Sequence, residues 1–419
     1  MSRQKKNLVT HMDNNRKTLF KLCCSLIQAK SENPPGDVTE AAMVTKCFLE
    51  KNGLSTKTYE PIKGRMSLIT TIGSGKKTLL FNGHIDVVPV GDTSRWSFHP
   101  LLGKVRGGKI LGRGASDMKC GVAAILFALS ELSRIEKDLN GKVVASVVCD
   151  EETGGEYGTK WLVEHGKLAG DACLIAETSG ALGAGYAINA GERGVCWINL
   201  RAQGKPAHGS TPQLGKNAIL AMMQTIANIQ QIENTKVNIP NSAKSLVEEG
   251  KAFLSLIAKK NKVTNLAEAL SHYSVNLGKI FGGNKVNVVP ESCEAEVDIR
   301  IPVGGSGEAI KVFLQKTLPI GLSYKVLNFA APSYTPAQAP LVKITKKAAM
   351  EFFNYMPPAQ IIPATSDGHM LREKLGIPTI SFGPGYAEKA HVYDEYVVAE
   401  DIVKFAKTYG GVALGFLGA

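Results

Sequence analysis

A histidine and an aspartate stand two residues apart in the sequence NGHID (82–86), at the end of a short apolar run. If that run is a β-strand, its period of two places the side chains of His84 and Asp86 on one face. Asp86 can then orient the His84 imidazole, which is how a metal-ligating histidine is held in one tautomer. Taken alone, the motif is more typical of a hydrogen-bonded structural histidine.

Four more side chains of the metal-ligand type follow other short apolar runs, either directly or in the next loop. They are Glu151, Glu152, Glu177 and His391. If the runs are parallel strands, their carboxyl ends lie at one edge of a sheet, where open α/β sheets bind ligands. We therefore expect these side chains to converge with His84 at that edge.

Asp117 lies in the Gly-rich segment GRGASDMK (112–119), immediately before an apolar helix. An aspartate in that position is commonly the N-cap of the helix. Two histidines and several carboxylates at one sheet edge are, however, the ligand chemistry of a pair of divalent metal ions. The sequence as a whole favours the metal pair.

The elements that must position these side chains alternate along the chain. Strands buried on both faces are expected where apolar runs are too short for helices, at 79–81, 143–148, 173–176 and 377–382. Helices are expected at 121–136 and 159–166, and two more between residues 19 and 53. This alternation predicts an α/β fold with a mainly parallel sheet flanked by helices.

The middle of the chain has a different pattern. Residues 195–202 and 286–301 alternate like half-exposed strands, and residues 216–232 form an amphipathic pattern typical of a helix. These features predict an inserted α+β domain, which also contains a Lys-rich helical stretch (241–274). The first kind of alternation resumes at residue 341, so we expect the C-terminal part to complete the first domain.

The segment GSGKK (73–77) is Gly-rich without being a phosphate-binding loop. The pattern GxxxxGK[ST] would need Gly at residue 70 and Ser or Thr at residue 77, where this chain has Thr and Lys. We interpret the segment as a hairpin turn.

Composition excludes several classes of protein. The 419 residues are 44% hydrophobic and 21% charged, which is typical of a globular protein and not of a disordered or membrane-embedded one. The net charge of +12 is spread along the chain, so we expect no nucleic-acid partner and no membrane partner. Eight scattered cysteines without a CxxC pair predict reduced thiols and a cytoplasmic location.

Five motifs in a fixed order carry a resemblance to a known family. They are NGHxD, GRGxSDMK, DEExG, AET and GPGxxxxAHxxDE, and together they resemble the M20 metallopeptidases and amidohydrolases. That family includes acetylornithine deacetylases, succinyl-diaminopimelate desuccinylases, aminoacylases and glutamate carboxypeptidases. The resemblance implies a zinc-exopeptidase-like catalytic domain over 12–190 and 332–419, with an inserted dimerisation (lid) domain over 191–331.

The resemblance also implies a cofactor of two divalent metal ions. Zinc or cobalt is expected, with manganese as a third choice, because sites rich in carboxylates accept all three. Asp117 would bridge the two ions. His84 and Glu177 would complete one site, and Glu152 and His391 the other.

Further roles are implied for residues that hold no metal. Glu151 would be the general base and Asp86 the partner of His84. His208, in GKPAH (204–208), would reach the active site of a partner subunit in a homodimer and donate to the developing oxyanion. Substrate contacts are implied at Arg193, Asn287, Arg300, Thr365 and Ser366.

The activity implied is hydrolysis of the amide bond of an N-acyl amino acid, a small molecule, by a water shared between the metal ions. The leading activities are acetylornithine deacetylation and succinyl-diaminopimelate desuccinylation, both of which are steps of amino-acid biosynthesis. The segment TSDG (365–368) favours the succinylated substrate, whereas Glu192 and Arg193 stand where bacterial desuccinylases carry paired arginines. The alternatives are a carboxypeptidase or dipeptidase of the same family and a noncatalytic binding protein, which the intact ligand positions disfavour.

Overall fold

The structure is a computed structural model that describes residues 3–418. Its contacts divide the chain into two units. The first unit contains the chain up to residue 190, residues 335–360, and the chain from residue 366 onward. The second unit contains residues 191–334 and the short segment 361–365, whose return to this unit the sequence does not predict.

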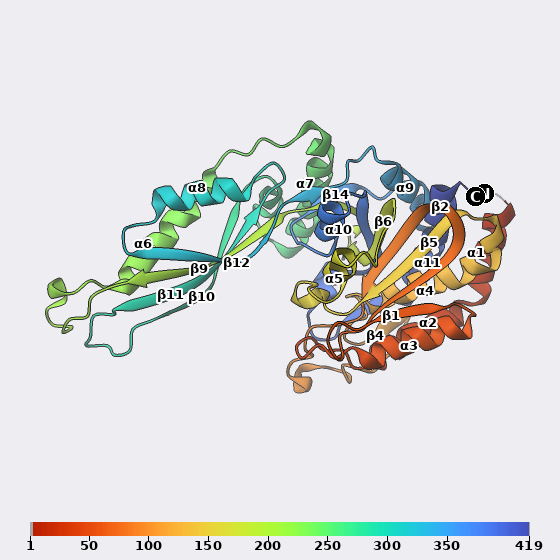
Figure 1. Cartoon of the computed structure of the whole chain (residues 1–419), viewed down its shortest axis with the longest axis horizontal. Helices are drawn as coiled ribbons and strands as arrows, with labels where there is room; N and C mark the ends of the chain where they lie inside the picture. Colours follow the sequence, from red (N-terminus) through yellow and green to blue (C-terminus); the bar gives the residue numbers. More distant parts are fainter. Residues whose placement is uncertain (1–2, 419) are drawn as a thin grey trace. The chain divides into compact units, whose positions relative to one another are not determined.

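The first unit is built around a sheet whose central strands are parallel (Figure 1). The second half of β2 pairs in parallel with β5 and β6, and β15 pairs in parallel with β6. Antiparallel β1 lies at one edge. These strands are β1 (Thr56–Tyr59), β2 (Ser67–His84), β5 (Asn140–Val148), β6 (Ala172–Ala181) and β15 (Thr379–Tyr386). The predicted α/β class is confirmed, with the sheet mixed at its edges.

β2 passes along both sides of β5. Its residues 68–74 and its residues 78–84 both pair with β5, and the register runs in opposite directions in the two halves. The chain reverses between them, where Gly73 has φ +79° and a Cβ would lie 2.3 Å from the carbonyl oxygen of Gly141. The predicted hairpin is therefore wrong in its pairing, because the two halves flank β5 and not each other.

Helices pack on this sheet. α4 and α11 contact β2, β5 and each other, and α1, α2 and α9 pack on them in turn. α4 is buried along its whole length because its sequence is largely apolar on every side, which is typical of a core helix. The helices of this unit are α1 (Arg3–Asn14), α2 (Arg16–Gln28), α3 (Thr39–Lys51), α4 (Lys119–Leu132), α5 (Thr159–Glu164), α9 (Pro340–Phe353), α10 (Gly368–Lys374) and α11 (Ala399–Leu417).

A small sheet joins two loops that matter below. Its strand order is β16–β4–β3, with bounds β3 (Lys104–Arg106), β4 (Lys109–Leu111) and β16 (Tyr396–Val398). β4 ends just before the loop of Asp117, and β16 begins just after the loop of His391. The remaining short strands are β7 (Gly185–Tyr186), β8 (Ile188–Glu192), β13 (Ser333–Tyr334) and β14 (Ala359–Ile362).

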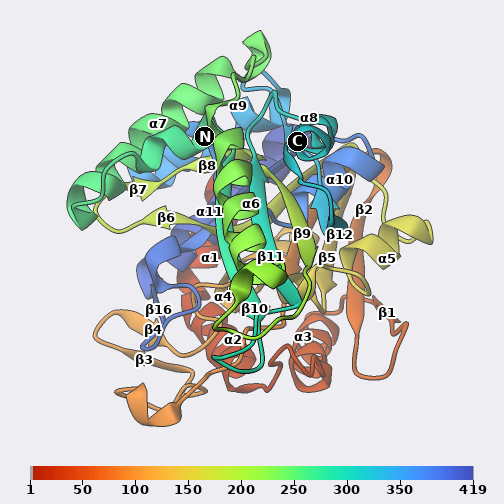
Figure 2. The same ribbon diagram turned by 90° about the vertical axis from the view of Figure 1, so that its left-hand side faces the viewer.

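The second unit contains a four-stranded antiparallel sheet in the order β10–β11–β9–β12. α6 lies across β9, β10 and β11, and with α8 it encloses the core of this unit (Figure 2). The elements are β9 (Gly194–Gln203), α6 (Ala218–Gln230), α7 (Asn241–Asn261), β10 (Ser274–Gly282), β11 (Ser292–Ile301), α8 (Gly307–Thr317) and β12 (Leu322–Ala330). The strand predicted from residue 286 begins only at residue 292.

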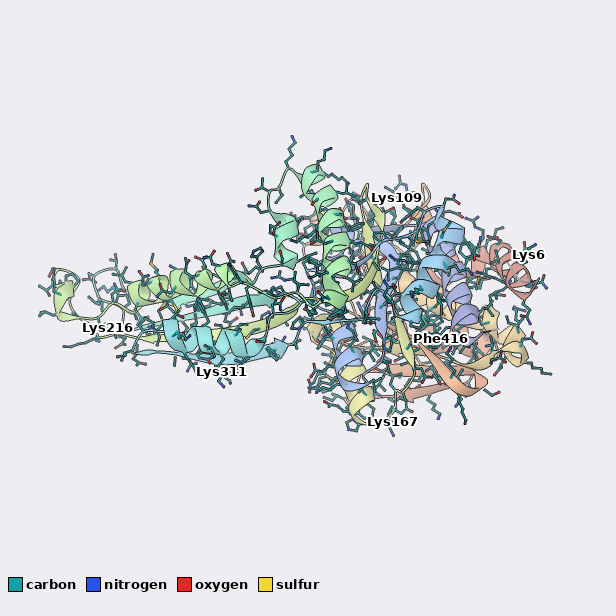
Figure 3. All side chains as sticks on the ribbon, turned by 90° about the horizontal axis from the view of Figure 1, so that it is seen from above. Lys6, Lys109, Lys167, Lys216, Lys311 and Phe416 are labelled. Carbon is teal, nitrogen blue, oxygen red and sulfur yellow. The ribbon has the colours of Figure 1, made fainter. Side chains whose placement is uncertain are left out.

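The surface carries lysines in both units. Figure 3 labels Lys6, Lys109, Lys167, Lys216 and Lys311, of which the first three belong to the first unit and the last two to the second. All eight cysteines are unpaired, and most of them are buried. Within residues 3–418, we find no helix that is both long and apolar enough to cross a bilayer.

Candidate metal centre

His84 is the last residue of β2 and is buried. Its Nδ1 lies 3.0 Å from the main-chain oxygen of Asp86 and 3.4 Å from Oδ1 of the same residue, so we infer that Nδ1 carries the proton and donates to Asp86. Nε2 then points to Asp117 Oδ1 at 3.1 Å and Glu177 Oε2 at 3.4 Å. This orientation is the one that a metal-ligating histidine adopts when a second group holds its other nitrogen.

His391 approaches Asp117 from a different loop. Its Nε2 lies 3.1 Å from Asp117 Oδ2 and 3.1 Å from Glu152 Oε2. Its backbone has φ +60°, a left-handed conformation that costs free energy for a residue other than glycine. The surrounding structure therefore holds His391 in an unfavourable backbone conformation that directs its ring to these carboxylates.

The electrostatics of the cluster favour positive charge. Hydrogen bonds to Asp117 and Glu152 raise the pKa of His391 to about 10. Burial alone would lower the pKa of His84, but its hydrogen bonds, above all to Asp117, raise it well above the ordinary value. Burial raises the pKa of Glu177 to about 7. Carboxylates that hold two imidazolium cations in this way also suit metal cations in the same positions.

The donor set fits two cations that share Asp117. One oxygen of Asp117 faces His84 and the other faces His391, so the carboxylate lies between two groups of ligands. Ligand atoms of His84, Asp117 and Glu152 lie within 4.8 Å of one another. The alternative role of Asp117 as a helix cap is wrong, because Met118 is the N-cap of α4 and no side chain caps it. The structure brings all five predicted ligands together, and their division between two ions stays a prediction.

Asp86 holds more than the imidazole of His84. It is fully buried, and its Oδ2 accepts a hydrogen bond from Asn33 Nδ2 at 2.9 Å. The main-chain nitrogens of Glu151 and Glu152 donate to Asp86 Oδ1 and Oδ2, each at 3.2 Å. Asp86 thus anchors the loop after β5 that carries both glutamates.

Glu151 lies beside the ligand cluster. Its Oε2 is 3.9 Å from His84 Nε2, whereas the carboxylate of its neighbour Glu152 contacts His391 directly. Burial raises the pKa of Glu151 well above the ordinary range, and the nearby carboxylates of Asp367 and Glu177 raise it further. A carboxylate with a raised pKa next to the ligands is suited to accept a proton near neutral pH.

In the second unit, His208 lies on an exposed loop. Its Nδ1 is 2.7 Å from Ser210 Oγ and accepts a hydrogen bond from the Ser210 main-chain nitrogen at 3.2 Å. Because Nδ1 is the acceptor, the proton of the neutral ring lies on Nε2. The main-chain oxygen of Asn287 accepts a hydrogen bond from Gly209 at 2.8 Å, so Asn287 adjoins this loop.

Three of the predicted substrate contacts gather elsewhere in the second unit. Arg193 is buried, and its Nη2 donates to main-chain or side-chain oxygens of His272, Ser274 and Arg300. Thr365 Oγ1 donates to the Arg193 main-chain oxygen at 2.9 Å. The Arg300 side chain is 28% exposed, which leaves it more accessible to a ligand than Arg193.

Ser366 belongs to the first unit, where its Oγ accepts a hydrogen bond from Gly368 at 3.2 Å. Sequence reasoning does not assign roles to Asn33 and Glu395, both of which contact the residues around the cluster. Asn33 begins the segment NPPG (33–36), and Glu395 is the last residue of the motif GPGxxxxAHxxDE.

Comparison with known proteins places the chain in a family. A model of peptidase family M20/M25/M40 matches residues 80–414. A Staphylococcus epidermidis protein named "Probable succinyl-diaminopimelate desuccinylase" is 26% identical over 409 residues, which cover 95% of this chain and 97% of that protein. A Halalkalibacterium halodurans protein named "N-formyl-4-amino-5-aminomethyl-2-methylpyrimidine deformylase" is 24% identical over 436 residues, covering 96% and 95%.

The fold is also that of solved structures. The structure of Dug1p, described as a di-peptidase from Saccharomyces cerevisiae, superposes with a TM-score of 0.78 at 15% identity, and each chain is covered completely. This likeness shows the fold, and the family model matches most of the sequence. The chain belongs to peptidase family M20/M25/M40 and is a metal-dependent hydrolase of amide bonds.

Proposed function

We propose that this protein hydrolyses the amide bond of an N-acyl amino acid with a free carboxylate, using two divalent metal ions, zinc or cobalt. The observation that carries the proposal is the position of Asp117: one of its oxygens faces His84 and the other faces His391. Glu151 lies beside His84. His84, Asp117 and Glu177 would hold one ion, and Asp117, Glu152 and His391 the other. When bound, such ions polarise an amide carbonyl and acidify water.

The residues around the ions supply the proton transfers. Glu151 accepts the proton of the attacking water as the new C–O bond forms. It then delivers this proton to the nitrogen of the leaving amine, so that the C–N bond breaks as the carbonyl re-forms. Asp86 keeps the proton of His84 on Nδ1 and holds the amide groups of the Glu151 loop. His208, through its Nε2 proton, donates to the oxygen that becomes negative during the reaction.

The free carboxylate of the substrate calls for a cation, and Arg300 is the better of two candidates. The buried Arg193 already donates to three acceptors of its own unit. Arg300 is partly exposed and pairs with Asp298 at 3.0 Å. Relatives named for desuccinylation and deformylation support removal of an acyl group as the reaction.

We further propose a homodimer in which His208 serves the partner's centre. Among the residues that the structure describes, β10 pairs with β11 alone and so forms an edge of the second-unit sheet. Large apolar side chains are exposed there and on α6, among them Phe281, Leu220 and Met223. An apolar surface beside an open sheet edge supports burial against a second copy. The unpaired cysteines support a cytoplasmic location.

The test is release of primary amine by the metal-free protein after reconstitution with zinc or cobalt. The substrate panel contains N-succinyl-diaminopimelate, N-acetylornithine, other N-acyl amino acids and dipeptides. We expect metal-dependent turnover of one acyl amino acid. Preference for dipeptides would replace the proposal by a peptidase, and no turnover of any substrate by fully metal-loaded protein would contradict it.

A further inference from the structure

We propose that Glu395 is a positioning residue for the metal centre, which fixes the backbone at Asp117 and ties it to the loop of His391. The inference rests on the metal site proposed above. The Glu395 side chain is fully buried. Its Oε1 accepts hydrogen bonds from the main-chain nitrogens of Ser116 at 2.8 Å and Asp117 at 3.1 Å. The backbone that carries Asp117 is therefore held by this carboxylate.

The other oxygen of Glu395 joins the same loop to the segment that follows His391. Oε2 accepts a hydrogen bond from Arg113 Nη1 at 2.7 Å, and the same nitrogen lies 3.0 Å from the main-chain oxygen of Val392. Arg113 is only 3% exposed, so this is a buried ion pair. Removal of one partner of such a pair leaves an uncompensated buried charge.

Backbone contacts strengthen the connection. Gly112 donates to the main-chain oxygen of Glu395 at 3.0 Å, and Ser116 Oγ donates to that of Tyr396 at 2.8 Å. β4 and β16 pair just beyond these residues. The left-handed backbone of His391 is thus part of a loop whose far end is anchored to the Asp117 loop.

This arrangement has an unequal effect on the two proposed ions. A shift of the Asp117 backbone disturbs a carboxylate that faces both histidines, whereas a shift of the 391–395 loop disturbs only the ligands on the side of His391. Loss of Glu395 should therefore weaken both metal-binding steps, and the step that uses His391 more. Mutation of a residue that orients metal ligands typically lowers metal affinity by about 10- to 100-fold.

The experiment uses Glu395→Gln in the full-length protein. The amide has only one acceptor oxygen, so its NH₂ group must face either Arg113 or the main-chain donors, and one contact becomes repulsive. Zinc or cobalt is titrated into metal-free protein by calorimetry, and the visible spectrum of cobalt reports each site. We expect the Kd of the site that contains His391 to rise about 10- to 100-fold and that of the other site to rise less.

Asp401→Asn is the matched control. Asp401, on α11, is also a buried carboxylate. It accepts a hydrogen bond from the Tyr186 hydroxyl at 2.8 Å. Thermal unfolding of both metal-free variants measures the loss of stability, and we expect metal affinity to change only in Glu395→Gln. If that variant does not fold, Arg113→Lys keeps the charge but removes the guanidinium Nη1 that contacts both Glu395 and Val392, and is expected to weaken the same site.

Three results would overturn the inference. They are wild-type affinity in folded Glu395→Gln, equal weakening of both steps, and the same loss of affinity in Asp401→Asn. Because the readout is metal binding and not turnover, failure here is distinct from failure of the proposed function. Wild-type protein that binds two ions but cleaves no amide would contradict the proposed substrate class alone.

Discussion

Asp86 Oδ1 accepts a hydrogen bond from the main-chain nitrogen of Glu151 at 3.2 Å, so the carboxylate that orients His84 also positions the proposed general base. Its second oxygen does the same for Glu152 and binds the side-chain amide of Asn33. One buried side chain therefore couples the end of β2 to the loop after β5. A substitution of Asp86 should therefore disturb both metal ligation and proton transfer.

Asp86→Asn should lower kcat by about 10- to 100-fold at saturating metal. The amide offers one acceptor where the carboxylate offers two, so the contacts of His84, Glu151 and Glu152 cannot all be kept. Steady-state kinetics with measured metal content checks this, and Asp92→Asn, an exposed aspartate of the next loop, is the control. An unchanged kcat would remove Asp86 from the machinery.

Glu151→Gln should retain both metal ions and lose about 10²- to 10⁴-fold in kcat, which is the usual contribution of a general base. The variant keeps the shape of the side chain but has no site for the proton. Glu156→Gln serves as the control because Glu156 lies in the same segment, is exposed and pairs with Lys160 at the surface. Near-wild-type turnover with full metal content would be incompatible with the assigned role.

The metal-free protein should become less stable as pH rises from about 4.5 to about 7. Burial raises the pKa of both Glu177 and Glu395 from 4.5 to about 7, so the folded protein binds these protons more tightly than the unfolded chain does. Their contribution to stability is complete below pH 4.5 and is lost as pH passes through 7.

Thermal unfolding in the presence of a chelator, measured across this pH range, checks the prediction. Glu177→Gln should flatten the slope, because the neutral amide has no proton to lose. Added zinc should reverse it, since metal binding requires ionised carboxylates. A Tm that rises with pH in the metal-free protein would contradict the raised pKa of Glu177 and Glu395.

The parts of the fold that could be predicted are those that the core determines. α4 and the central strands are largely buried and largely apolar, so their sequences indicate them. β10 and β12 lie at sheet edges and are exposed along most of their length, so neither has the continuous apolar run of a buried strand. α1 is mostly polar, and only the burial of Leu8 and Met12 against the rest of the first unit explains it.

The site was predictable where ligand types recur in ordered motifs, and not where long-range contacts decide. From the sequence, Arg193 is expected to be a cation that is free to bind a substrate carboxylate. In the structure it is buried by residues about 80 positions away, His272 and Ser274, which end the Lys-rich stretch. In the sequence, nothing distinguishes Glu395 from other acidic residues in loops. Only the folded chain shows that its carboxylate accepts a hydrogen bond from the backbone of Asp117.

Ser210 should control which nitrogen of His208 carries the proton. Its hydroxyl lies 2.7 Å from Nδ1 and its main-chain N–H also points there, so the neutral ring keeps its proton on Nε2. Ser210→Ala removes the stronger donor. The share of the Nδ1–H tautomer should then rise, which ¹⁵N spectra of histidine-labelled protein measure directly.

The same change should lower kcat, but less than His208→Ala, for which the loss of an oxyanion donor predicts about 10²- to 10³-fold. Thr211→Ala is the control, because Thr211 contacts His208 only at its main-chain oxygen. A changed tautomer with unchanged kcat would show that His208 does not act in turnover. A lower kcat with an unchanged tautomer would mean that Ser210 acts through the shape of the loop, since the main-chain donor alone would then suffice to orient the ring.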